Sequence, residues 1–119
     1  MRRNLSLVSA MLVLLAVLKL PPACEGKPQS APPKVITIAI RDFKFVPETV
    51  TLHEGDTVEL RNDDNVLHTA TADGQTQKPA FDSGSISTGA TWSYVAGTKG
   101  TYNYTCTFHP YMKGELIVQ

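Results

Sequence analysis

Sulfur and imidazole side chains are scarce in this chain of 119 residues, which has two cysteines, three methionines and three histidines. Two cysteines cannot form the disulfide frameworks that staple many small exported domains. Charges are balanced at 11 basic and 11 acidic residues without a basic stripe, which argues against nucleic acid as a partner. No segment has a sustained helical pattern, and there is no internal repeat. The few sulfur and imidazole side chains are therefore candidate functional residues.

The longest apolar run is residues 5–18, LSLVSAMLVLLAVL, directly after Arg2 and Arg3 and shortly before a proline pair. A basic start, an apolar run and helix-breaking residues predict a secretory signal over residues 1–26. The run is shorter than the ~20 residues that span a bilayer. An uncleaved anchor and a lipoprotein signal, with Cys24 as the lipidated residue, are the alternatives. We expect a periplasmic or exported protein that meets a membrane only through this end.

Removal of residues 1–26 would leave 8 basic and 10 acidic residues, a net charge of −2, and a single cysteine, Cys106. Residues 27–34, KPQSAPPK, are typical of a short Pro-rich tether. The rest of the chain, 35–119, is long enough for one domain. An oxidising compartment pairs cysteines and attacks exposed single ones, so Cys106 requires an explanation beyond filling a core, its ordinary role.

From residue 35 onward, apolar side chains recur with a period of two, and Gly and Asp punctuate the gaps. This pattern predicts an all-β, antiparallel sandwich or barrel of seven to eight strands. The turn residues 53–56, HEGD, indicate a hairpin between 49–52 and 57–60. The seven predicted strands are 35–40, 49–52, 57–60, 66–72, 91–95, 101–105 and 115–118.

Three potential ligands follow one another in CTFHPYM, where Cys106, His109 and Met112 are three residues apart. The last predicted strand starts soon afterwards, so the loop that carries them is short and must keep them close together. His68 follows a polar loop and could meet this loop at one end of the sandwich. His53, in the predicted hairpin turn, is expected to be exposed and is not counted as a ligand.

One thiolate, two imidazoles and a weak axial thioether form the type 1, or blue, copper arrangement. Thiolate and thioether favour Cu(I), whereas imidazole accepts both oxidation states, so a rigid site of this composition suits electron transfer. Cys106, His109 and Met112 could supply three of these ligands, and His68 the fourth if it meets their loop.

The residues that carry this chemistry resemble the small blue copper proteins, the cupredoxins. Asn62, His68 and residues 100–118 match that family, and the Cys-x2-His-x2-Met spacing is similar to its amicyanin-like members. The resemblance extends over residues 35–119. It implies a Greek-key β-sandwich with one copper ion per chain, held by His68, Cys106, His109 and Met112. It also implies that the copper shuttles single electrons, with a c-type cytochrome or a dehydrogenase as redox partner.

Three positions depart from the amicyanin-like pattern, which has proline at Leu67 and Phe108 and asparagine at Thr69. They bear on the reduction potential and the partner surface. Phe108 has an N–H that proline lacks, and we expect it to donate to the sulfur of Cys106 and raise the potential. Asp63 and Asp64 are expected to be solvated, or to orient the loop before His68.

Apolar residues beside the predicted ligand His109, namely Phe108, Pro110 and Tyr111, are expected to form a docking patch for a redox partner, unless they only pack the loop. The alternative function is a periplasmic copper chaperone or buffer. An enzyme with Cys106 as nucleophile and His109 as base is disfavoured, because the loop offers no acid to orient the base and Met112 stays unexplained.

Overall fold

The computed structural model describes residues 19–20, 22–23, 31–74 and 80–119. The predicted signal over 1–26 lies almost entirely outside these residues, as do Cys24 and the first half of the tether. Residues Ala31–Gln119 form one compact unit. Within the described residues, no helix is long and apolar enough to cross a membrane. The boundaries expected at residues 26 and 34 stay predictions.

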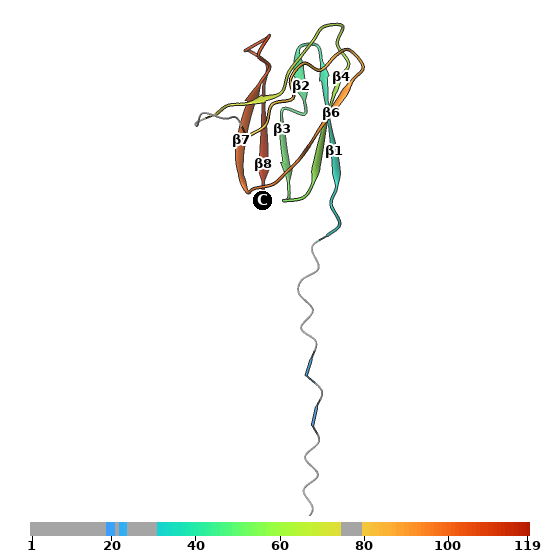
Figure 1. Cartoon of the computed structure of the whole chain (residues 1–119), viewed down its shortest axis with the longest axis vertical. Coiled ribbons are helices and arrows are strands. Elements are labelled where there is room, and N and C mark those ends of the chain that lie inside the picture. Colours follow the sequence, from blue (N-terminus) through green and yellow to red (C-terminus); the bar gives the residue numbers. More distant parts are fainter. Residues whose placement is uncertain (1–18, 21, 24–30, 75–79) are drawn as a thin grey trace, which may run out of the picture. The chain divides into compact units, whose positions relative to one another are not determined.

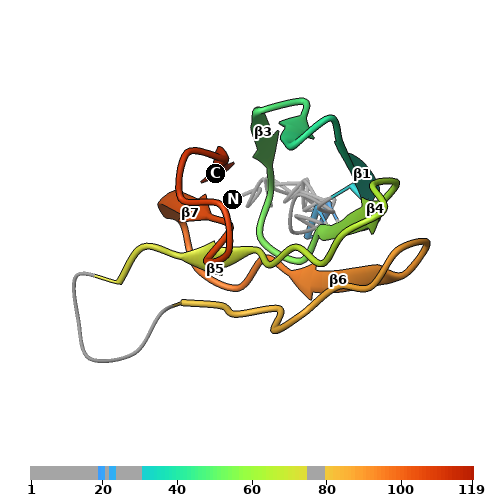
Figure 2. The same ribbon diagram turned by 90° about the horizontal axis from the view of Figure 1, so that it is seen from above.

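Eight strands form two four-stranded sheets that face each other (Figure 1). One sheet has the order β2-β1-β4-β6 and the other β3-β8-β7-β5. Figure 2 looks along the sandwich and shows β5 and β7 on one side, with β1, β4 and β6 on the other. The predicted class and number of strands are therefore confirmed. The strands are β1 (Val35–Arg41), β2 (Lys44–Val46), β3 (Thr49–Leu52), β4 (Thr57–Asn62), β5 (Thr71–Ala72), β6 (Thr91–Val95), β7 (Gly100–Thr105) and β8 (Lys113–Val118).

The pairing is not antiparallel throughout, because β1 runs parallel to β4 and β3 runs parallel to β8. The predicted hairpin is also wrong, since β3 and β4 belong to different sheets. The segment between them crosses the sandwich. The carboxylate of Asp56 holds this crossing by accepting the backbone N–H groups of His53 and Lys34, both at 2.8 Å.

Two local expectations also need correction. The strand predicted over 66–72 shrinks to β5, and upstream of it His68 only bridges Ile86. Strand β2 was not predicted because the turn before it contains no glycine. That turn consists of Asp42 and Phe43, with φ of 52° and 56°. Two consecutive left-handed residues are the signature of the type I′ hairpin turn, which usually has Asn-Gly or Asp-Gly.

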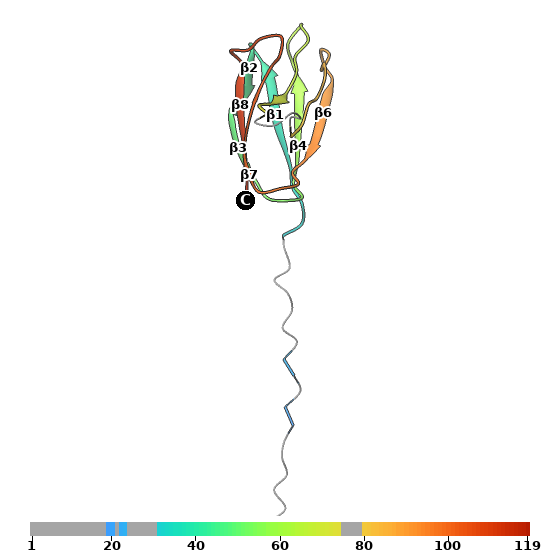
Figure 3. The ribbon, with the colours of Figure 1, turned by 60° about the vertical axis from the view of Figure 1, so that its left-hand side comes forward.

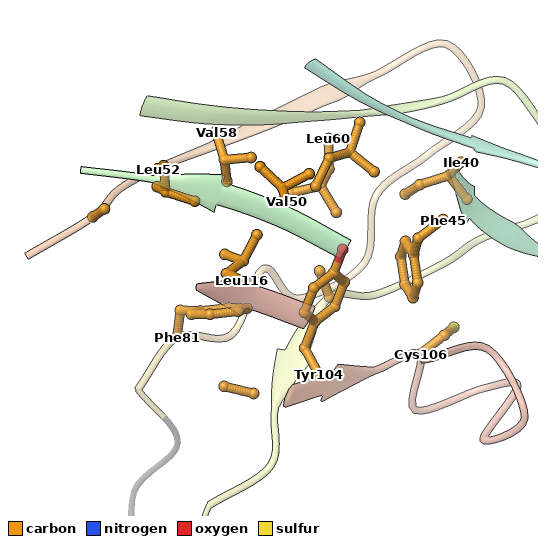
Figure 4. Packing of buried hydrophobic residues seen from close by; sticks show 14 of the residues in the cluster. Ile40, Phe45, Val50, Leu52, Val58, Leu60, Phe81, Tyr104, Cys106 and Leu116 are labelled. Carbon is orange, nitrogen blue, oxygen red and sulfur yellow. The ribbon is translucent and has the colours of Figure 1, made fainter. Parts of the chain in front are cut away.

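The core lies between the sheets and is built from alternate residues of the strands (Figure 4). Tyr104 on β7 stands at its centre, with its ring 4.7 Å from that of Phe45 on β2. Gly114 on β8 leaves room for this ring, because a Cβ at that position would overlap Tyr104. Cys106 follows β7 on the same face as Tyr104, as the alternation predicted, and is fully buried.

Three connections that matter for the site gather at one end of the sandwich, the end opposite the C-terminus (Figures 1 and 3). They are the β1–β2 turn at 42–43, the β4–β5 connection at 63–70 and the β7–β8 loop at 106–112. The sheets thus bring together segments that are far apart in the sequence.

Candidate metal centre

His68 is fixed by its backbone in the β4–β5 connection, three residues before β5. Its N–H and C=O form an antiparallel bridge with Ile86, at 3.3 and 2.7 Å. The side-chain amide of Asn62, itself fully buried, donates to the carbonyls of Ile86 and Val66, both at 2.8 Å. The imidazole of His68 is fully buried. Its position is therefore set by the β4–β5 connection as a whole.

The second ligand segment is a tight loop closed by its own backbone. The N–H of His109 donates to the carbonyl of Cys106 at 3.2 Å, and the N–H of Met112 donates to that of His109 at 2.9 Å. The N–H of Cys106 donates to the carbonyl of Met112 at 3.2 Å and closes the loop. Met112 is 2% exposed. The even spacing of the three residues thus corresponds to successive turns of one compact loop.

The donor atoms of His68, Cys106 and His109 converge within 4.8 Å of one another. The Nδ1 atoms of the two histidines lie 3.6 and 3.5 Å from the Sγ of Cys106. Metal bonds of about 2.0 Å to imidazole and 2.3 Å to thiolate, as in zinc proteins, separate such donors by about 3.5–3.7 Å at tetrahedral to trigonal angles. The arrangement therefore fits one metal ion without rearrangement.

The composition of this cluster favours copper. Within the described residues Cys106 is the only cysteine, and it forms no disulfide. Thiolate with imidazole suits copper or zinc, and a nearby thioether favours Cu(I). No carboxylate takes part in the cluster, which disfavours the hard ions Mg²⁺ and Ca²⁺.

Asp64 fixes the orientation of the His68 ring. Its Oδ2 lies 2.9 Å from Nε2 of His68, which directs Nδ1 toward Cys106. Partial burial raises the pKa of Asp64. The N–H groups of Phe43 and Asp42 and the His68 ring together lower it by more than burial raises it, so the net pKa is below its usual value. The carboxylate is therefore charged at neutral pH and orients the His68 ring, whereas the sequence suggested only solvation or a role in orienting the loop before His68.

Thr69 links the two ligand segments. Its backbone N–H donates to Sγ of Cys106 at 3.3 Å, and its hydroxyl accepts the N–H of Thr107 at 2.9 Å. Among the described hydrogen bonds to Sγ, none comes from the N–H of Phe108. The expected Phe108 bond is therefore not found, and the donor to the sulfur is Thr69.

Phe43 is the site residue that the sequence did not reveal. Its ring packs edge-on against both His68 and His109, with centroids 5.5 and 5.0 Å apart. It reaches them from the β1–β2 turn, 25 residues before His68 in the sequence. The turn that carries it has no glycine and was not predicted, and the parallel pairing of β1 with β4 is what brings it here.

The remaining polar candidates stand apart from the cluster. His53 is exposed, as expected, and contacts Asp56 at 3.6 Å. Asp63 forms a bidentate ion pair with Arg61, with N–O distances of 2.7 and 2.9 Å, and this pair lowers the pKa of Asp63. Beside the ligand loop a surface pocket is lined by residues that include Phe43, Phe45, Tyr111 and Met112.

Comparison with known proteins agrees with this site. The cupredoxin-like domain family matches residues 8–118. The amicyanin of Paracoccus versutus is 29% identical over 89 residues, covering 74% of this chain and 67% of that protein. Amicyanin-alpha of Methylorubrum extorquens is 26% identical over 118 residues, 98% of this chain and 99% of that protein.

Solved structures of cupredoxins are similar to this chain in fold. The Cu(I) form of an amicyanin mutant is similar, with a TM-score of 0.66 and 26% identity, over 71% of this chain and 82% of that one. A purple cupredoxin from Nitrosopumilus maritimus has a TM-score of 0.63 and 28% identity, over 71% of this chain and 99% of that one.

Proposed function

The chain belongs to the cupredoxin-like family and has a single copper site, and from this premise we propose that it is a type 1 copper protein that carries single electrons. The observation that carries the proposal is the convergence of one thiolate and two Nδ1 atoms at 3.5–3.6 Å on a rigid sandwich. The proposed ligands are His68, Cys106, His109 and Met112.

When bound, copper supplies a Cu(I)/Cu(II) couple that takes one electron from a reduced donor and gives it to an oxidised acceptor. The protein keeps the ligands in place during this exchange. Cys106 and His68 are fully buried, and their positions are fixed by Thr69, Asp64 and Asn62. Because these groups are held by hydrogen bonds from different elements, a change of charge at the site requires little movement.

Electrons are proposed to pass through His109, which is half-buried and lies beside exposed apolar residues. Phe108 and Tyr111 are 51% and 68% exposed, and Pro110 between them is exposed as well. Leu67, next to His68, is 47% exposed. These four residues, called the docking patch below, are of the kind that suits brief contact with a redox protein such as a c-type cytochrome or a dehydrogenase.

The protein is proposed to act outside the cytoplasm, on the basis of the signal expected over 1–26. A copper chaperone or buffer is the second function to consider. Burial of Cys106 and His68 disfavours it, since transfer of copper requires ligands that a partner can reach. Catalysis is disfavoured by the same burial, because a substrate could not reach the sulfur of Cys106.

The test is spectroscopic and uses the full chain loaded with Cu(II), beside the variant Cys106→Ser. We expect an intense visible thiolate-to-copper band and a narrow copper hyperfine splitting, both lost in the variant. An ordinary pale Cu(II) spectrum that the substitution leaves unchanged would overturn the proposal. Slow loss of copper to a chelator would support a carrier, whereas rapid loss would support a chaperone.

A further inference from the structure

Phe43 occupies a backbone position that is unfavourable for a large side chain. It is the second central residue of the β1–β2 turn and has a φ of 56°, next to Asp42 with a φ of 52°. Turns of this type favour glycine at this position, because a Cβ is strained in the left-handed region. A bulky residue persists there only where its surroundings hold it.

Asp64 holds the turn, and it does so with the carboxylate that also orients His68. Oδ1 of Asp64 accepts the N–H of Asp42 at 2.7 Å, and Oδ2 accepts the N–H of Phe43 at 3.0 Å. The same Oδ2 lies 2.9 Å from Nε2 of His68. Its own backbone is fixed, since the N–H of Asp64 donates to the side chain of Asn62 at 2.9 Å. The position of Phe43 and the orientation of His68 are thus coupled through one group.

The ring of Phe43 fills the space beside both imidazoles. It meets His109 at 85° and His68 at 86°, which is edge-to-face geometry, and the two imidazoles are themselves 4.9 Å apart. Such contacts are favourable and restrict the rotation of the rings that form them. Phe43 is 38% exposed, so it stands between the imidazoles and solvent.

His109 depends on this packing more than His68 does. In the described part of the chain, its imidazole makes no side-chain hydrogen bond apart from the 3.5 Å contact with Cys106. His68 has Asp64 as a hydrogen-bonding partner. The His109 ring is bounded instead by Phe43 and by Tyr111, whose centroid is 6.1 Å away.

We propose that Phe43 is a positioning residue of the copper site, whose ring holds His109 with Nδ1 toward Cys106 and limits access of solvent to both histidines. Asp64 maintains this arrangement by securing the turn. The inference rests on the proposed ligand roles of His68 and His109. Partners of metal ligands that fix ring orientation commonly contribute about 10- to 100-fold in metal affinity.

The test compares three variants at one position. Phe43→Gly and Phe43→Asn remove the ring and suit the left-handed turn, so neither adds backbone strain. Phe43→Tyr keeps the ring and serves as the matched control. Two readouts are measured for each: the rate of copper release to a chelator, and the ring resonances of His109 by nuclear magnetic resonance in the copper-free protein.

We expect copper release to be roughly tenfold faster in Phe43→Gly and Phe43→Asn, the lower end of the range for such partners. The His109 ring signals should move toward those of a freely rotating histidine, while Phe43→Tyr stays close to the unsubstituted protein in both readouts. Release rates and ring signals that are unchanged in the Gly and Asn variants would overturn the inference. Signals of Tyr104 that move together with those of His109 would also overturn it, because the change would then be global.

Asp64→Asn provides a second route to the same arrangement. In the unsubstituted protein, three N–H groups share the two oxygens of the Asp64 carboxylate. Asparagine offers the same three groups only one carbonyl oxygen. We expect the ring signals of both His68 and His109 to shift, whereas Phe43→Gly shifts mainly those of His109. Unchanged His109 signals in Asp64→Asn would contradict the coupling through the turn.

The His109 resonances of the copper-free protein test the positioning role of Phe43 independently of the proposed function. If the unsubstituted protein lacks the thiolate-to-copper band, the proposed function fails on that result alone. If the band is present but neither copper release nor the His109 resonances respond to loss of the Phe43 ring, only the positioning role fails.

Discussion

The backbone N–H of Thr69 donates to the sulfur of Cys106 at 3.3 Å, while the Thr69 hydroxyl accepts the N–H of Thr107 at 2.9 Å. One residue therefore ties the β4–β5 connection to both the proposed thiolate ligand and the start of the ligand loop. A hydrogen bond to a ligating sulfur stabilises the electron-rich reduced site and raises its potential. The backbone bond is retained in any substitution except proline. The contribution of the Thr69 side chain can therefore be measured separately from that of its backbone N–H.

Thr69→Val removes the hydroxyl and leaves the Thr107 N–H without its acceptor. We expect the free energy of unfolding of the copper-free protein to fall by about 1 kcal/mol, because this N–H is only partly buried. Thr69→Ser retains the acceptor and should lose much less. Urea denaturation measures both. A loss in Thr69→Ser as large as that in Thr69→Val would contradict the role of the hydroxyl, because serine retains it.

Tyr104→Phe is expected to leave stability unchanged or to raise it by up to about 1 kcal/mol. Within the described residues, the buried hydroxyl of Tyr104 has no hydrogen-bond partner. A buried polar group without a partner destabilises the folded state, so its removal removes that penalty. Burial, with the charge of Glu48 as a smaller cause, also raises the pKa of Tyr104, so the hydroxyl is neutral at any physiological pH. Thermal unfolding of the copper-free protein tests this, and a marked loss would reveal a bound water or another partner.

Gly114→Ala should destabilise the protein by about 1–3 kcal/mol, the usual range for an overpacked core. The added Cβ would overlap the ring of Tyr104, and both residues lie on paired strands that have little room to move. The double variant with Tyr104→Leu measures the coupling between the two sites. We expect the alanine to cost less in that background than alone, and equal costs would contradict a clash with the ring.

Much of the proposed site was accessible from the sequence because three of its four candidate ligands are close together in the chain. Cys106, His109 and Met112 lie in one loop, and their spacing together with His68 and the predicted export signal indicated the chemistry. Alternation along β7 correctly placed Cys106 on the buried face beside Tyr104. The match of the loop and His68 to a known family then supplied the Greek-key sandwich that periodicity could not distinguish from a barrel.

Strand pairing was less accessible, because a period of two identifies strands without naming their partners. The segment 53–56 has the composition of a hairpin turn, yet it crosses between sheets, since Asp56 binds backbone groups on both sides of the crossing. The roles of Phe43 and Asp64 depend on contacts made possible by the β1–β4 pairing. No local pattern contains that information.

Asp56 should make the stability of the crossing depend on pH. The N–H groups of His53 and then Lys34 lower the pKa of Asp56, which outweighs the effect of burial, and the nearby His53 and Lys34 charges act in the same direction. An unfolded aspartate has a pKa of about 3.9. The charged carboxylate therefore contributes stability that is fully present above this value and is lost as the pH falls through the lower folded pKa.

Asp56→Asn cannot show this dependence, so it serves as the reference. We expect the difference in unfolding free energy between the unsubstituted protein and Asp56→Asn to be constant from about pH 7 to 5 and to shrink below about pH 4. Urea denaturation of the copper-free proteins measures it. In a His53→Gln background the same dependence should remain, because the backbone N–H of residue 53 is retained. A difference that grows on acidification would reverse the assigned direction.

A positive charge placed in the docking patch should slow electron transfer, whereas the same charge placed elsewhere on the surface should not. Tyr111 is 68% exposed beside His109, so Tyr111→Lys would introduce a charge into an apolar contact that desolvates on binding. Val95→Lys is the matched control, because Val95 is 59% exposed but pairs with Thr57 at the opposite end of β4 from Asn62. We expect electron transfer with a c-type cytochrome to slow on the order of tenfold in Tyr111→Lys, as a loss of about 1.4 kcal/mol would give, and to stay unchanged in Val95→Lys.

Stopped-flow measurements over a range of ionic strength would separate loss of apolar contact from charge repulsion, since only repulsion weakens with added salt. Equal rates for the two variants would mean that Tyr111 only packs the loop.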